Sequence, residues 1–490
     1  MSPISPISPM NNLYDLYQQH PCITTDSRDC PEGSIFIALK GDNFNGNRFA
    51  LQALEKGCAY AIVDEDLNEE LRMKNEEFAT AVPSSEGMAA ANSSFFIHHS
   101  SLIKVDSCLQ TLKDIAREHR RQFDIPVIAI TGTNGKTTTK ELIKAVLSEK
   151  YNVLATEGNF NNDVGVPKTL LRMNKEHEIA IIEMGASHPG DIKTLVETAE
   201  PTCGLITNVG RAHLQGFGSF EGVIKTKGEL YDYLKANTQG PIFINADNDY
   251  LLDLIGDDEE IFLTPYSTDP EKQYMCISGE VVSCDPELTF RWRKPLMELE
   301  ETGASQKWHK VRTHLIGAYN IDNLLAAIAV GINFGVDRKQ ICHALENYVP
   351  TNSRSQLVQT KRNRLIVDAY NANPSSMAAA LDNFRLMPAF EGEAKMAILG
   401  EMRELGDVSR EEHQHILDLL TNSGIEEAWL VGNEFNGLTP PPSHPSPLTT
   451  HHFHDVEEVK AELQAHRLAG KLILIKGSNG NKLYQLPEFL

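Results

Sequence analysis

The stretch that most constrains the fold covers residues 125–139, Ile-Pro-Val-Ile-Ala-Ile-Thr-Gly-Thr-Asn-Gly-Lys-Thr-Thr-Thr. Its apolar run predicts a buried strand, its glycines predict a turn, and helical spacing of apolar residues over 138–150 predicts a helix. Amides of such a turn and of the helix N-terminus can hold phosphate groups, while Lys136 reaches a terminal phosphate and Thr137 ligates Mg²⁺. We therefore predict a phosphate-binding loop; the alternative is an ordinary strand-helix junction without a ligand.

Composition narrows the class of protein. The 490 residues suffice for about three domains. A net charge of -22 argues against general affinity for nucleic acid. No apolar run approaches the ~20 residues that span a bilayer, so we expect no membrane insertion. The eight cysteines form no CxxC pair and the opening Ser-Pro-Ile repeat lacks the features of a signal peptide, so we expect reduced thiols and a cytoplasmic location.

The first unit, residues 20–108, carries two polar segments around one strand. Residues 25–28 precede the expected strand 34–39, and a Gly/Asn-rich loop at 40–46 follows it. Both segments could line one ligand site. They could equally be two turns of a small α/β domain.

The second unit alternates strands and helices. Further strands are expected at 152–155, 179–182, 204–207 and 241–244. Such alternation predicts a mostly parallel sheet with ligand groups at the carboxyl ends of its strands. Glu183 and His213 follow two of these strands, and with Thr137 they suit a divalent cation, although a lone histidine is more often structural. Residues 262–313 contain short alternating segments, such as 274–278 and 288–292, which are typical of an antiparallel insertion.

The third unit again alternates strand and helix, which predicts a doubly wound sheet. The fold class is therefore α/β, with a small N-terminal α/β domain, a central P-loop ATPase-like domain built on a mostly parallel sheet, and a C-terminal Rossmann-like domain. The expected strands of the third unit are 364–367, 396–399, 428–431 and 472–475. The predicted domains span residues 1–108, 109–349 and 350–490.

Several motifs together resemble the Mur ligase family of ATP-dependent amide-bond-forming enzymes. They are Thr131-Gly-Thr-Asn-Gly-Lys-Thr137, Glu183-Met-Gly185, Ala212-His213, Lys225-Thr-Lys-Gly-Glu229 and Leu315-Ile-Gly-Ala-Tyr-Asn320. Segments 156–167, 368–377 and 400–406 are similar to the member that adds D-alanyl-D-alanine to UDP-N-acetylmuramoyl-tripeptide. The resemblance implies ATP and Mg²⁺ as cofactors, those two small-molecule substrates, an acyl-phosphate intermediate and domain closure on binding. We also expect a monomer.

The resemblance assigns roles to individual residues. Lys136, His213, Lys227 and Lys476 are the expected catalytic residues, and Lys227 is expected to carry a carbamate. The metal ligands would be Thr137, Glu183, His213 and Lys227. The nucleotide would contact Gly132, Thr133, Asn134, Gly135, Lys136, Thr137, Thr138, Asn159, Asn320, Arg354 and Asp368. The other substrates would contact Ser27, Arg28, Asn45, Gly46, Asn371, Asn373 and Ser478.

Two other functions stay open at this point. A folylpolyglutamate synthase shares the phosphate loop and the ligation chemistry, but the sequence Asn-Ala-Asn-Pro after Asp368 speaks against it. A nucleotide-binding switch or structural ATPase would use the loop for binding alone. Lys225 competes with Lys227 as the modified lysine, but it lies about 200° around the expected helix 222–234 and would face away.

Overall fold

A computed structural model describes residues 9–41, 43–67, 73, 101–256, 261–302, 307–350, 356–421, 423–439 and 448–490. The Ser-Pro-Ile repeat and Arg354 lie outside these ranges. The chain forms two compact units, and each is described by itself. The first comprises Met1–Asp124, Phe160–Lys175 and Glu197–Glu200, and the second comprises Ile125–Asn159, Glu176–Val196 and Pro201–Leu490. The three-domain limits given above stay a prediction.

The first unit is a parallel four-stranded sheet with helices against it. Strand β2 is buried along its whole length. Tyr14 and Tyr17 of α1 and Leu112 and Ile115 of α4 belong to the same core. The strands, in sheet order, are β1 (Ile23–Thr24), β2 (Ile35–Ile37), β5 (Tyr60–Val63) and β6 (Leu102–Lys104), and a short hairpin joins β3 (Lys40–Gly41) to β4 (Phe44–Asn45). The helices are α1 (Pro9–Gln19), η1 (Gly46–Phe49), α2 (Ala50–Glu55), α4 (Cys108–Arg120) and α6 (Gly165–Leu170).

The second unit contains the predicted central sheet. Its nine strands run in the order β15-β14-β13-β12-β11-β10-β7-β9-β8, parallel from β8 to β13 and antiparallel from β13 to β15. Strand β7 lies inside the sheet between β10 and β9, which explains its continuous burial. The strands are β7 (Val127–Thr131), β8 (Val153–Ala155), β9 (Ile179–Glu183), β10 (Cys203–Ile206), β11 (Ile242–Asn245), β12 (Leu263–Ser267), β13 (Ile277–Cys284), β14 (Glu287–Arg293) and β15 (His309–Ile316).

Helices cover both faces of this sheet. Apolar residues of α5, α12 and α13 share one core with Ile128 and Ile130 of β7. Tyr231 of α9 approaches the sheet separately, and its hydroxyl accepts a hydrogen bond from the amide of Ile206 (3.4 Å). The helices are α5 (Lys136–Ser148), α7 (Asp191–Ala199), α8 (Leu214–Phe217), α9 (Phe220–Asn237), α10 (Asp249–Ile255), η4 (Pro270–Lys272), α11 (Leu296–Thr302), η5 (Ala318–Asn320), α12 (Ile321–Asn333) and α13 (Arg338–Asn347).

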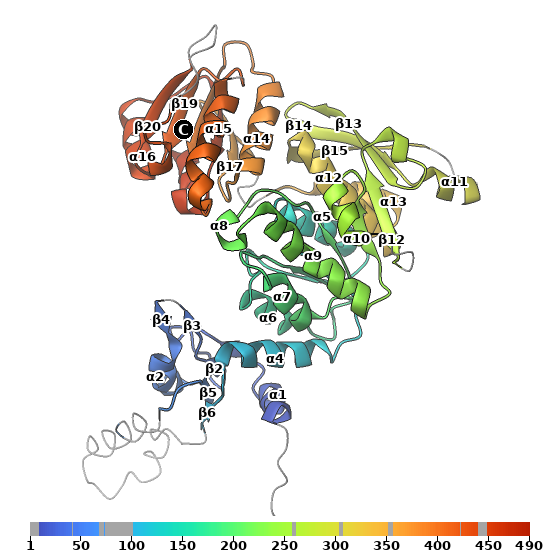
Figure 1. The fold of residues 1–490 in the computed structure, drawn as a ribbon, viewed down its shortest axis with the longest axis vertical. Coiled ribbons are helices and arrows are strands. Elements are labelled where there is room, and N and C mark those ends of the chain that lie inside the picture. Colours follow the sequence, from blue (N-terminus) through green and yellow to red (C-terminus); the bar gives the residue numbers. More distant parts are fainter. Residues whose placement is uncertain are drawn as a thin grey trace, which may run out of the picture. The chain divides into compact units, whose positions relative to one another are not determined.

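The C-terminal part of this unit is the predicted doubly wound sheet. Its order is β16-β17-β21-β18-β19-β20, with only β16 antiparallel among the described strands. Helices α14 and α15 share a core with one face, whereas α16 and η9 share a core with the other (Figure 1). The elements are β16 (Gln356–Gln359), β17 (Arg364–Asp368), α14 (Pro374–Leu386), β18 (Ala394–Gly400), η6 (Gly406–Val408), α15 (Ser409–Thr421), β19 (Glu427–Val431), η7 (Asn433–Phe435), β20 (Thr449–Phe453), α16 (Val456–Ala465), β21 (Lys471–Lys476), η8 (Asn479–Asn481) and η9 (Leu483–Glu488).

The expected elements match the structure apart from their ends and two segments. Strands β13 to β15 are antiparallel, as predicted for the insertion, whereas β12 lies in the same predicted segment but pairs parallel with β11 and β13. Residues 274–276 precede β13 instead of forming its start. The turn amides of Met275 and Cys276 both donate to the carbonyl oxygen of Lys272 (3.2 and 3.1 Å), which keeps this segment out of the ladder. Among the described residues, no helix is both long and apolar enough to cross a bilayer.

Candidate active site

The phosphate loop joins β7 to α5, as predicted, and two of its positions admit only glycine. Gly132 has φ 139° and Gly135 has φ 79°, both in the region that side chains disfavour. A Cβ at Gly132 would lie 2.0 Å from the hydroxyl of Thr207, and one at Gly135 would lie 2.5 Å from the Asn323 amide oxygen. The neighbours therefore hold the loop in one narrow shape.

Residues after β10 brace the loop from outside. The amide of Asn134 donates to Asn208 Oδ1 (2.9 Å), and Asn208 Nδ2 donates back to Asn134 O (3.1 Å). The Thr207 hydroxyl donates to the same carbonyl oxygen (2.6 Å). These bonds preorganise the loop, so the loop need not reorder when a phosphate binds.

Lys136 and Thr137 are placed as the motif predicts. Lys136 Nζ curls over the loop and donates to the carbonyl oxygens of Gly132 (2.6 Å) and Thr133 (3.0 Å). The Thr137 hydroxyl donates to Glu183 Oε1 (3.1 Å) at the buried carboxyl end of β9. A hydroxyl and a carboxylate beside a phosphate loop are the oxygen ligands that Mg²⁺ prefers, so these two side chains fit that ion.

His213 and Lys227 lie near Lys136. Burial lowers the pKa of His213, the carboxylate of Glu404 opposes this shift, and the charges of Lys136 and Lys227 add to it. The His213 ring is hydrogen-bonded to Glu404 through Nδ1. In the described residues, no three His, Cys, Asp or Glu side chains group as a metal centre.

Lys227 is buried on α9, whereas Lys225 is exposed. The expectation that the two lysines face opposite ways is confirmed. Lys227 Nζ lies 5.4 Å from the centroid of the Phe217 ring. Burial, reinforced by Lys136, drives the pKa of Lys227 well below its usual range. Lys227 is therefore not a solvated surface lysine, while the carbamate stays a prediction.

The residues expected near the nucleotide base differ in setting. Asn320 is buried, and its Oδ1 accepts from Asn323 Nδ2 (2.9 Å), while Asn323 Oδ1 accepts from the Thr139 hydroxyl (2.9 Å). Asn320 is thereby tied to α5. Asn159 is exposed, and Thr138 is half-buried in the first turn of α5. No motif in the sequence gives a signal for the role of Asn323.

The C-terminal site residues cluster where β17 and β21 end. Asp368 pairs with Lys476 in the register of the two strands, and Lys476 Nζ donates to Asp368 Oδ2 (2.7 Å) and to Asn371 O (3.2 Å). The Ser478 hydroxyl donates to the carbonyl oxygen of Glu401 (3.2 Å). Lys476 is fully buried, so its charge is balanced by Asp368.

Asn373 has a structural role that the sequence analysis missed. Its Oδ1 accepts from the amide of Ser376 (2.9 Å), which makes it the N-cap of α14, with Pro374 as the first helical residue. Its Nδ2 also donates to Asn134 Oδ1 (2.8 Å). The sequence Asn-Pro-Ser-Ser is itself a helix-start signature and could have revealed the cap.

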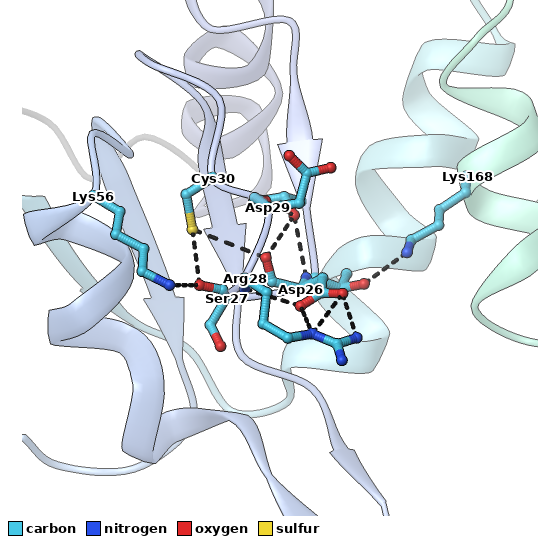
Figure 2. Close-up of polar contacts among 9 residues, drawn as sticks. Asp26, Ser27, Arg28, Asp29, Cys30, Lys56 and Lys168 are labelled. Carbon is cyan, nitrogen blue, oxygen red and sulfur yellow. Dashed lines mark hydrogen bonds and ion pairs between the residues drawn. The ribbon is translucent and has the colours of Figure 1, made fainter.

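The polar turn of the first unit is braced by basic side chains (Figure 2). Arg28 Nε and Nη2 donate to the two carboxylate oxygens of Asp26 (2.9 and 2.7 Å). Lys56 Nζ donates to Ser27 O and Lys168 Nζ to the Thr25 hydroxyl (both 2.6 Å). The turn thus combines an exposed guanidinium with two lysines. Lys168 comes from α6 and lies far from the turn in sequence, so the sequence alone did not predict its contact with the turn.

Asn45 and Gly46 shape the second polar segment. Asn45 Oδ1 accepts from the amide of Asn47 (3.0 Å), and its Nδ2 donates to Glu65 Oε1 (3.0 Å). A Cβ on Gly46 would lie 2.5 Å from Leu39 O. The identities of Asn45 and Gly46 are therefore explained by local structure, and the contact of these residues with a substrate stays a prediction.

Matches to known protein families cover most of the chain. Residues 21–120 match the catalytic domain of the Mur ligase family, 130–331 the Mur ligase middle domain, and 353–479 the Mur ligase glutamate ligase domain. The UDP-N-acetylmuramoyl-tripeptide--D-alanyl-D-alanine ligase of Bacillus subtilis (strain 168) is 30% identical over 471 residues, which cover 96% of this chain and 92% of that relative. The ligase of the same name from Escherichia coli (strain K12) is 32% identical over 421 residues, covering 85% and 82%.

Solved structures agree with the sequence matches. MurF from Acinetobacter baumannii superposes with a TM-score of 0.78 at 26% identity, covering 98% of this chain and 97% of that one. MurF from Thermotoga maritima, solved in complex with ADP, gives a TM-score of 0.73 at 23% identity and 96% coverage of both chains, which supports the fold. Together with the motifs and the loop geometry, these matches show that this chain belongs to the Mur ligase family.

Proposed function

We propose that the chain is an ATP-dependent ligase that joins D-alanyl-D-alanine to UDP-N-acetylmuramoyl-tripeptide in peptidoglycan precursor synthesis. The observation that carries the proposal is the braced phosphate loop with Lys136 over it and the Thr137–Glu183 pair beside it. Relatives that bear this activity in their names align over more than four fifths of the chain. The loop supports a nucleoside triphosphate as energy source, and the relatives support an amide bond as product.

The first chemical step brings two anions together. A carboxylate oxygen of the tripeptide bonds to the γ-phosphorus of ATP, the bond from that phosphorus to the β–γ bridging oxygen breaks, and ADP leaves. Lys136 and the loop amides offset the repulsion and stabilise the charge that develops on the phosphoryl oxygens. Mg²⁺, when bound by Thr137 and Glu183, adds Lewis-acid polarisation of the phosphate.

The second step forms the amide. The amine of D-alanyl-D-alanine attacks the acyl carbon, inorganic phosphate leaves, and the nitrogen loses a proton. We place Asn371, Asn373 and Ser478 on the dipeptide side, because amide and hydroxyl side chains both donate and accept hydrogen bonds. Asp368 would face the nucleotide, together with Arg354, Asn159 and Asn320, while Lys476, which pairs with Asp368 at 2.7 Å, would act at the reactive centre.

Lys227 is proposed to act as a carbamate. An unmodified ammonium offers no acceptor for a cation, whereas a carbamate supplies hard oxygens. The burial of Lys227 on the face of α9 opposite Lys225 supports this role, since a solvated lysine would have no reason to be enclosed. His213, whose ring lies near Lys136 and Lys227, would complete the metal-binding residues.

The nucleotide part of the acceptor substrate is assigned to the first unit. Ser27 and Arg28 lie on the turn that the basic side chains brace, and Asn45 and Gly46 lie where β4 meets η1. An exposed guanidinium can pair with a diphosphate. We further propose that the protein works as a cytoplasmic monomer with these small molecules as its partners, without nucleic acid, in keeping with its net charge of -22.

An assay with omitted substrates tests the proposal. ADP release should require ATP, UDP-N-acetylmuramoyl-tripeptide and D-alanyl-D-alanine together, and the product should be the pentapeptide nucleotide. ADP release driven by a folate and glutamate would instead favour a folylpolyglutamate synthase. ATP turnover that ignores both peptide substrates would identify a binding or switching ATPase.

A further inference from the structure

Lys140 is a fully buried cation that the mechanism above does not use. It lies on α5 one turn after the phosphate loop, and its relative exposure is 0%. Its Nζ donates to the carbonyl oxygen of Thr156 (2.6 Å) and lies 2.8 Å from Glu141 Oε1 and 4.0 Å from Glu183 Oε2. Burial of an ammonium group is unfavourable unless the group is paired and hydrogen-bonded. These contacts offset that cost, but they do not explain why a charged side chain occupies this position.

The contacts of Lys140 converge on Glu183. Thr137, on the same face of α5, donates its hydroxyl to Glu183 Oε1 (3.1 Å), while Lys140 lies on the side of Oε2. Thr156, whose carbonyl oxygen Lys140 binds, accepts the amide hydrogen of Glu183 through its own hydroxyl (3.0 Å). Helix α5 therefore holds Oε1 by a hydrogen bond from Thr137 and places the Lys140 charge 4.0 Å from Oε2, which is an electrostatic contact and not a hydrogen bond. Lys140 also ties that helix to the residue after β8.

A purely structural role gives a different expectation. If Lys140 only balanced charge in the core, K140M would lower the free energy of unfolding, because removing one partner of a buried ion pair leaves the other uncompensated, but it would leave Mg²⁺ binding unchanged. Retaining the charge makes sense if the orientation of the carboxylate matters. Outer contacts that orient a ligand typically affect metal affinity about 10- to 100-fold.

We propose that Lys140 is a positioning residue for metal binding: with Thr156 it fixes the Glu183 carboxylate so that Oε1, beside the Thr137 hydroxyl, faces the cation bound with the nucleotide. The inference rests on the proposed function only in taking Thr137 and Glu183 as the metal ligands. Any nucleotide that binds with Mg²⁺ at this loop would depend on Lys140 in the same way, whatever the peptide substrates are.

Calorimetric titration with ADP tests the proposal without catalysis. The full chain is compared with K140M, K140Q and K140R, once in excess Mg²⁺ and once in EDTA. K144M is the matched control, because Lys144 lies one turn further along α5 and is exposed. We expect K140M and K140Q to bind ADP in EDTA like the natural protein, but to lose about 10- to 100-fold in the Mg²⁺-dependent gain of affinity. K140R should retain part of that gain, and K144M all of it.

Two results would overturn the role. One is a Mg²⁺-dependent gain in K140M and K140Q equal to that of the natural protein; the other is an equal loss of ADP affinity in EDTA and in Mg²⁺, which would mean general distortion of the loop. If K140M does not fold, as judged by its thermal transition, K140Q decides, since its amide can still donate to Thr156 O without the charge. Failure of the ligase assay with normal ADP binding would count against the proposed function and leave Lys140 unaffected.

Discussion

Replacing Lys136 with alanine separates the phosphate chemistry from the fold. Lys136 Nζ donates to the carbonyl oxygens of Gly132 (2.6 Å) and Thr133 (3.0 Å). Both residues lie in the loop that directly precedes α5, the helix that carries Lys136. These bonds are local to the loop, and hydrogen bonds of a charged group contribute about 1.5–3 kcal/mol, so their loss should lower the free energy of unfolding by about that amount. Removal of one preorganised electrostatic group at a reacting centre costs about 10²–10³ in kcat, or ~2.7–4 kcal/mol.

The assay is steady-state release of inorganic phosphate at saturating substrates, paired with thermal unfolding. Lys136→Ala should lose at least about 10² in kcat while its thermal transition stays close to that of the natural protein. Lys144→Ala, on the exposed side of the same helix, should change neither. A normal kcat in Lys136→Ala would refute the reasoning that this side chain stabilises the transferred phosphoryl group.

Three further substitutions test other parts of the molecule, and the third of them concerns Asp322 in the first turn of α12. Lys227→Ala should be nearly inactive and partly restored by a small added carboxylate, whereas full activity, or an unmodified ammonium in a nucleotide-bound crystal structure, would exclude the carbamate. Asn373→Ala should lower the free energy of unfolding by about 1 kcal/mol because it removes the cap of α14, and it should raise KM for the dipeptide more than for ATP; equal changes would restrict Asn373 to its structural role. Burial raises the pKa of Asp322 to about 6, so the folded state favours its neutral form and loses stability as pH rises from the unfolded value near 4 through 6. Asp322→Asn should therefore stabilise the protein by about 3 kcal/mol at pH 7.5 and by about 1 kcal/mol at pH 4.5, as measured by chemical denaturation; a gain independent of pH would contradict the assignment.

Local pattern was enough to predict the parts of the fold that depend on one element. The strand at 127–131, the glycine turn and the helix after it follow from apolar periodicity and from glycines whose Cβ would collide with neighbours. The opposite exposure of Lys225 and Lys227 follows from helix geometry alone. The doubly wound C-terminal sheet follows from alternating strands and helices.

Tertiary contacts set the limit of prediction from the sequence. In the sequence, nothing distinguishes Lys140 from the other lysines of an amphipathic helix. Only the fold shows that its Nζ donates to Thr156 O and lies near Glu183. Lys168 is far along the chain from Thr25, so their contact has no local signal. Residues 274–276 alternate like a strand, but two amide hydrogen bonds to Lys272 turn the backbone away from the sheet.

An isotope experiment tests the central claim most directly. UDP-N-acetylmuramoyl-tripeptide labelled with ¹⁸O in its terminal carboxylate is incubated with ATP, D-alanyl-D-alanine and the protein, and the released phosphate is analysed by mass spectrometry. An acyl phosphate transfers one carboxylate oxygen to phosphate, so we predict one ¹⁸O in each phosphate formed and an equal amount of pentapeptide nucleotide. Unlabelled phosphate released with ADP would mean that water attacks ATP directly, and it would contradict ligation through an acyl phosphate.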